Sequence, residues 1–131
     1  MTEPLSALDR MIRRTNIPVL DAQGVAKETA AGDWILLFAD DPVRRPEVAD
    51  LAVILPEIVK GRVGSLNFGV IDREAEDELA PVLGVLIKPS LVFLRDGEVT
   101  GVVPRVKDWV FYEQMLAELL PLSTEDKRAS A

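Results

Sequence analysis

Carboxylates carry most of the chemistry that this sequence offers. Its 131 residues include no cysteine and no histidine, whereas 22 acidic residues outnumber 15 basic ones and leave a formal charge of −7. Thiolate nucleophiles, disulfides, zinc–thiolate sites and histidine-based catalytic triads are therefore excluded. The excess of acid argues against nucleic acid and anionic membrane surfaces as partners and favours a basic partner.

The acidic residues gather in two segments. The first contains Asp40, Asp41, Glu47 and Asp50, and the second contains Asp72, Glu74, Glu76, Asp77 and Glu78. Clustered carboxylates are suited to binding arginine, because a guanidinium can donate two parallel hydrogen bonds to one carboxylate. The chemistry indicated is recognition of a basic segment.

Plainer interpretations of the same residues remain open. Asp40 and Asp41 precede a proline and suit a turn or a helix cap. The run 74–78 is typical of a solvated helix face near a helix N-terminus. Arg44 and Arg45 are expected to be surface cations, and they can pair with the neighbouring acids within the chain.

Apolar spacing predicts the elements that must position these residues. The predicted helices are 5–14, 22–31, 46–61, 74–83 and 109–120, and the predicted strands are 17–20, 34–39, 66–71, 90–94 and 99–103. The unalternating run 34–39 is typical of a central strand buried on both faces. In the predicted helix 74–83, the residues expected to point inward are Ala75, Leu79, Val82 and Leu83. Asp96-Gly97 between two apolar runs predicts a tight hairpin.

This order of elements predicts an α/β fold with a central mixed sheet and helices on both faces. Residues 1–120 are expected to form one domain, with 1–16 as an N-terminal helical extension and 121–131 as a flexible tail. Loops that follow parallel strands share one edge of a sheet, so the two acidic groups can lie on one side. No apolar run reaches the ~20 residues of a membrane span and no secretory signal is present, so we expect a cytoplasmic protein without membrane insertion.

From residue 34 to residue 120 the chain resembles a thioredoxin. The matching positions are Ala80-Pro81, Gly84-Val85, Lys88-Pro89-Ser90 and Asp96-Gly97-Glu98-Val99. The resemblance implies a thioredoxin-like fold in which Pro89 is the cis-proline that faces the redox site. However, Pro42 and Arg45 stand where thioredoxins carry their two cysteines, and Leu36 stands where redox members carry a buried acid. The fold is expected without the redox chemistry.

A narrower resemblance is to the HupG/HyaE family of hydrogenase expression proteins. It rests on Asp41-Pro42-Val43-Arg44-Arg45-Pro46-Glu47-Val48, followed by Asp50 and Leu55-Pro56-Glu57. It implies a chaperone, with neither catalysis nor a cofactor, for the small-subunit precursor of a nickel–iron hydrogenase, which binds the basic, apolar-cored twin-arginine signal peptide before export. The candidate partner-binding residues are Asp40, Asp41, Pro42, Glu47, Asp50, Lys88 and Pro89.

Three other functions are alternatives to a chaperone role. A thiol oxidoreductase is excluded, since disulfide exchange needs a thiolate. A structural or assembly module, which dimerises or docks into a larger complex through an apolar surface, remains the alternative, so a homo-oligomer is possible. An enzyme with paired carboxylates would need a cleft that a compact domain of this kind seldom offers.

Overall fold

A five-stranded mixed sheet forms the centre of the molecule in this computed structural model, which describes residues 6–41, 44–62 and 65–122. The strand order is β1-β3-β2-β4-β5. β1 and β2 both run parallel to β3, whereas β4 is antiparallel to β2 and β5 is antiparallel to β4. The predicted mixed sheet is therefore confirmed, with the second predicted strand at its centre.

The described residues form the predicted helices and strands in the predicted order, with one additional short 3₁₀ helix, η1. The strands are β1 (Val19–Leu20), β2 (Asp33–Phe38), β3 (Asn67–Ile71), β4 (Ser90–Arg95) and β5 (Glu98–Pro104), and the helices are α1 (Ala7–Thr15), α2 (Ala22–Glu28), α3 (Val48–Gly61), η1 (Arg73–Ala75), α4 (Glu76–Leu83) and α5 (Trp109–Leu119).

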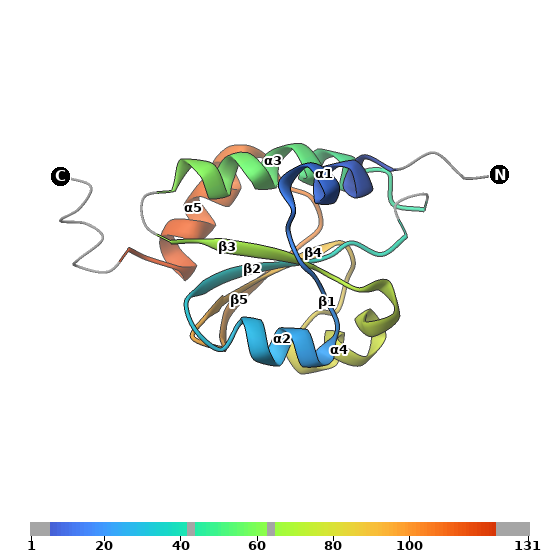
Figure 1. The fold of residues 1–131 in the computed structure, drawn as a ribbon. Coiled ribbons are helices and arrows are strands. Elements are labelled where there is room, and N and C mark those ends of the chain that lie inside the picture. Colours follow the sequence, from blue (N-terminus) through green and yellow to red (C-terminus); the bar gives the residue numbers. More distant parts are fainter. Residues whose placement is uncertain (1–5, 42–43, 63–64, 123–131) are drawn as a thin grey trace.

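Helices cover both faces of the sheet. Helices α1, α3 and α5 lie on one face, and α2 and α4 lie on the other (Figure 1). Strand β2 supplies side chains to both cores: Ile35 and Leu37 join the first, and Leu36 and Phe38 join the second. This two-sided burial explains why the strand shows no polar alternation.

Helix α1 is held at its first turn by a capping box. The Ser6 hydroxyl accepts a hydrogen bond from the Asp9 backbone N–H, and the Asp9 carboxylate accepts one from the Ser6 backbone N–H. Such reciprocal caps satisfy two of the backbone donors left open at a helix start. Leu8 and Met11 are buried against the core, so helix α1 packs as part of the fold.

Two details of the helix predictions were wrong. Helix α3 begins at Val48, two residues later than predicted, because Pro46 and Glu47 take part in tight turns in which their carbonyls accept from N–H groups three residues ahead. Val82, predicted to point inward, is 73% exposed. The phase of the segment is set by Ala75, Leu79 and Leu83, which are buried at intervals of four residues and leave Val82 outside.

Two local predictions were confirmed. Asp96 and Gly97 both have positive φ, 50° and 84°, as a type I′ hairpin turn requires. The Lys88–Pro89 peptide bond is cis. Among the described residues, no helix is long and apolar enough to cross a membrane.

Candidate functional site

The first part of the candidate site is the loop that follows the carboxyl end of β2. Asp40 adopts a left-handed backbone conformation with φ 61°, which is uncommon outside glycine, although aspartate and asparagine tolerate it better than most residues. Its carboxylate accepts a hydrogen bond from Arg45 Nε at 3.2 Å. Burial opposes ionisation, but the Asp41 backbone N–H and the Arg45 guanidinium outweigh it and hold the pKa of Asp40 below its ordinary value. Asp40 is therefore a charged residue held in a fixed orientation.

A buried glutamate connects this loop to the cis-proline. Glu76, at the start of α4, is only 2% exposed. One of its carboxylate oxygens accepts from the Asp40 backbone N–H at 3.1 Å, and the other lies 3.2 Å from the ammonium of Lys88. Glu76 thus joins the loop after β2, the start of α4 and the loop that precedes β4. The interpretation of 74–78 as a solvated face is wrong at this position.

The sequence contains a signal that would have identified Glu76. Residues 76, 79 and 83 have the i, i+3, i+7 spacing of one helix face, and Leu79 and Leu83 are buried. An acid on the apolar stripe of a helix must find a partner, because a buried carboxylate without one is costly. Its position in an acidic run conceals this pattern.

Lys88 is held between two carboxylates. Its ammonium lies 3.2 Å from Glu76 and 3.2 Å from Asp77, which is itself fully open to solvent. Burial works against the charged ammonium, but the two acids outweigh it and raise the pKa of Lys88 above its ordinary value. Glu76 therefore links Lys88, and with it the neighbouring Pro89, to the loop that carries Asp40.

The remaining candidates lie at the margin of this cluster. Asp41 is 3.8 Å from Arg73, in an ion pair that is largely exposed. Glu47 and Asp50 are exposed at the start of α3, and no hydrogen bond or ion pair in the described part of the chain joins them to Asp40 or Lys88. Pro42 lies outside the described residues. Arg45 and Arg73 show that the pairing of these acids within the chain, which the sequence left open, does occur.

Apolar side chains project into solvent beside the charged cluster. Leu86 is 95% exposed, and Val82 and Ile87 are also exposed. Val82 lies in the last turn of α4, and Leu86 and Ile87 lie in the loop that leads from α4 to Lys88 and Pro89. Large exposed apolar groups that gather in one segment are typical of a surface that contacts another molecule.

A hollow of about 290 Å³ opens between α1 and the carboxyl ends of β1 and β3. Its apolar walls include Leu8, Ile12 and Val70, and its polar walls include Asp40 and Glu76. Such a lining suits the apolar stem and cationic head of a long basic side chain. In the part of the chain that is described, no group of three or more acidic residues is arranged to hold a metal ion.

Comparison with known proteins identifies the family. The sequence pattern described as Hydrogenase-1 expression protein HyaE matches residues 7–112. The chain belongs to the HyaE family of hydrogenase expression proteins. It is 36% identical over 120 residues to the hydrogenase expression/formation protein HoxO of Cupriavidus necator, and this match covers 89% of the chain and 74% of HoxO.

Solved structures agree with this assignment. A crystal structure of the hydrogenase expression/formation protein HupG from Rhodopseudomonas palustris is similar with a TM-score of 0.57 and 32% identity, and the match covers 79% of this chain and 94% of that one. The solution structure of desulfothioredoxin from Desulfovibrio vulgaris matches with a TM-score of 0.62 and 25% identity, over 78% of this chain and 96% of that one. The thioredoxin-like α/β fold is thus confirmed, and the HyaE family member carries it without any cysteine.

Proposed function

We propose that this HyaE family protein is a chaperone, without catalysis, that binds the small-subunit precursor of a nickel–iron hydrogenase through its twin-arginine signal peptide. Membership of a family of hydrogenase expression proteins supports a role in hydrogenase maturation. The observation that carries the finer proposal is the juxtaposition, in one cluster, of carboxylates and exposed apolar side chains. A signal of this kind has a basic segment followed by an apolar one, and it needs both surfaces.

The carboxylates in this region hold the chain's own arginines only loosely. Asp40 pairs with Arg45 and Asp41 pairs with Arg73, and both arginine side chains are substantially exposed. Exposed ion pairs of this type typically contribute only about 0–1 kcal/mol. An arginine of the signal can therefore replace Arg45 or Arg73 without breaking a strong contact.

The apolar part of the signal would contact the edge beside Pro89. Leu86 and Ile87 are exposed there, and burying such side chains stabilises a complex by about 25 cal/mol for each Å² removed from water. Glu76 and Lys88 have a supporting role in this proposal, because they fix the loop that carries Asp40 relative to the loop that carries Pro89.

A peptide titration with paired variants tests the proposal. The variant Asp40→Asn with Asp41→Asn should weaken binding of the signal peptide by about 1 kcal/mol, the upper end of the range for exposed ion pairs. Asparagine also suits the left-handed backbone at position 40. The loss should shrink as salt rises, because exposed charges are screened over about 8–10 Å.

The matched control is Glu74→Gln with Glu78→Gln, which removes the same charge from exposed positions of the second acidic segment. The buried Glu76 is unsuitable as a control. A peptide in which lysines replace the two arginines should bind more weakly, since lysine cannot pair with a carboxylate through two parallel hydrogen bonds. Equal losses for both double variants would show an effect of bulk charge and contradict the assigned site.

A further inference from the structure

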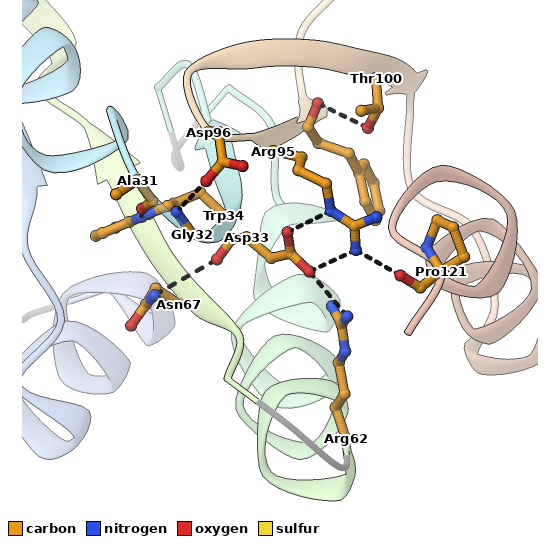
Figure 2. Close-up of polar contacts among 11 residues, drawn as sticks. Ala31, Gly32, Asp33, Trp34, Arg62, Asn67, Arg95, Asp96, Thr100 and Pro121 are labelled. Atoms are coloured by element: carbon orange, nitrogen blue, oxygen red, sulfur yellow. Dashed lines mark hydrogen bonds and ion pairs between the residues drawn. The ribbon is translucent and has the colours of Figure 1, made fainter. Parts of the chain in front are cut away.

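Among the described residues, an arginine cluster at the opposite end of β2 contains one buried polar atom without a hydrogen-bond partner. Arg95 donates two hydrogen bonds to Asp33, at 2.8 and 2.9 Å, and Arg62 Nη2 donates a third at 2.8 Å (Figure 2). The Arg62 side chain is only 4% exposed, and its Nη1 is buried without a hydrogen-bond partner in the described part of the chain. Buried polar groups nearly always have partners, so Arg62 indicates that an acceptor is missing here.

Arg62 lines a groove between the C-terminal half of α3 and helix α5. The groove has a volume of about 450 Å³, and its floor and walls are mainly apolar, with Ile58, Leu116 and Leu120 among them. Trp109, at the first turn of α5, lines it too and is 37% exposed. A hollow of this size between two helices is large enough to take several apolar side chains of another molecule.

Each of the two helices that border the groove carries an acidic residue without an ion pair in the described part of the chain. Glu57 on α3 and Glu113 on α5 line it, and both are exposed. Neither forms an ion pair within the described ranges. The groove therefore combines an apolar floor, a negative rim and a cationic inner end.

We propose that this groove binds a helix of a partner protein whose apolar face is flanked by lysine or arginine residues. The apolar face would fill the floor, as in other helix-in-groove complexes, and the basic residues would pair with Glu57 and Glu113. The C-terminal end of the helix would lie beside Arg62, because the last carbonyls of a helix lack partners and carry partial negative charge. Since Nη1 is buried, seating the helix end requires a small movement of the groove wall.

This surface is separate from the proposed signal-peptide site. Helix α3 has 14 residues and so extends for about 21 Å, with the acidic loop before its first turn and the groove at its last. The proposal goes beyond the proposed function, because it gives the protein a second partner at the other end of α3.

A designed pair of helical peptides tests the groove directly. One peptide carries leucines at i, i+3, i+4 and i+7 with lysines on its flanks, and its twin carries glutamates in place of the lysines. Binding to the full chain is measured by calorimetry and by the fluorescence of Trp109, since the other tryptophan, Trp34, is buried. The lysine peptide should bind at least about tenfold more tightly than the glutamate peptide, a difference of about 1.4 kcal/mol.

Variants of groove residues, with one control outside the groove, assign the binding to the groove. Ala117→Arg places a long side chain in the groove and should weaken the lysine peptide about tenfold, whereas Ala49→Arg, which adds the same charge to an exposed position of α3 outside it, should not. Arg62→Lys keeps the positive charge but removes Nη1, and should weaken binding about threefold. Thermal melts of each variant establish that it is folded.

Two results would overturn the proposal: equal affinity of the two peptides, or no effect of Ala117→Arg. Unchanged affinity in Arg62→Lys would overturn the placement of the helix end. The variant Asp40→Asn with Asp41→Asn should leave this binding unchanged. Failure of the groove and failure of the signal-peptide site are therefore distinguished.

Discussion

The two ends of strand β2 hold the same residue types in different surroundings. At its amino end, Asp33 is enclosed by Arg62 and Arg95 (Figure 2). At its carboxyl end, Asp40 and the following Asp41 pair with Arg45 and Arg73, whose side chains are 43% and 57% exposed. Ion pairs therefore form at both ends of β2, and the two ends differ in how deeply these pairs are buried.

This difference in burial distinguishes ion pairs that stabilise the fold from ion pairs whose arginine can be replaced by an arginine of another molecule. Asp33 joins β2 to the end of α3 and to β4, and Arg95 extends the contact to the Pro121 carbonyl beyond α5. Removing one member of an enclosed pair leaves charged groups without partners, which is strongly destabilising. At the site end, water can replace the lost partner, so the same substitution should change binding more than folding.

The largest expected effect is at the enclosed end. Asp33→Asn leaves two guanidinium groups with only an amide oxygen to share, and should lower the free energy of unfolding by about 3 kcal/mol, the lower limit for breaking a buried pair. The lower limit applies because Arg95 is still about one-third exposed. Urea unfolding at neutral pH measures this, and a loss no larger than that of Asp41→Asn would remove the distinction between the two ends.

A smaller loss is expected at the buried part of the site. In Glu76→Gln the new side chain can still accept from the Asp40 N–H, but Lys88 loses its buried charge partner. We expect a loss of about 1.5 kcal/mol in unfolding free energy, the lower end for a hydrogen bond to a charged group. Asp77→Asn is the matched control, because it removes the other, fully exposed partner of Lys88, and it should cause no measurable change.

The pH dependence of stability should follow the same contrast. Arg95, opposed by burial and aided by Arg62, holds the pKa of Asp33 below its ordinary value. The folded-state pKa is thus lower than the unfolded one, so this stabilisation is complete above about pH 4 and is lost as pH falls through the folded value. As the pH is lowered from 7 to 2, the urea concentration at the unfolding midpoint should therefore fall steeply in the unsubstituted protein and less steeply in Asp33→Asn. Parallel curves would contradict this assignment.

At alkaline pH two groups act in the same direction. Burial raises the pKa of Tyr112, and Glu76 and Asp77, against burial, raise the pKa of Lys88. Both folded-state pKa values lie above the unfolded ones, so the stabilisation is complete below about pH 10 and is lost as pH rises further. In Glu76→Gln the Lys88 contribution should decrease, and comparison of urea midpoints at pH 9 and 11 measures it.

The smallest effect on folding is expected at the exposed rim. Asp41→Asn should change the free energy of unfolding by less than about 0.5 kcal/mol, because its pair with Arg73 is long and exposed. When Asp41→Asn and Asp33→Asn are measured under identical conditions, their losses of unfolding free energy give the difference between the two ends of β2. A loss above 1.5 kcal/mol would show that the rim acids also have a structural role.

Local sequence signals predicted the fold well and the ion pairs poorly. The Asp96-Gly97 turn and the apolar run of β2 depend on neighbouring residues, so spacing alone revealed them. The partners of Asp33 lie 29 and 62 residues away, and nothing in the sequence near Asp33 indicates them. The acidic segments are visible in the sequence, but the burial of Glu76 within one of them depends on tertiary packing, so the sequence did not single it out.

Recognition of the precursor through its signal peptide is the core of the proposed function. The most direct measurement is calorimetric titration of the full chain with the small-subunit precursor and, separately, with the same subunit lacking its signal. Removal of the signal should weaken binding at least about tenfold, and Asp40→Asn with Asp41→Asn should reduce the difference. Equal affinity for the two forms would show that the signal peptide is not recognised and would favour a module that docks onto the folded subunit.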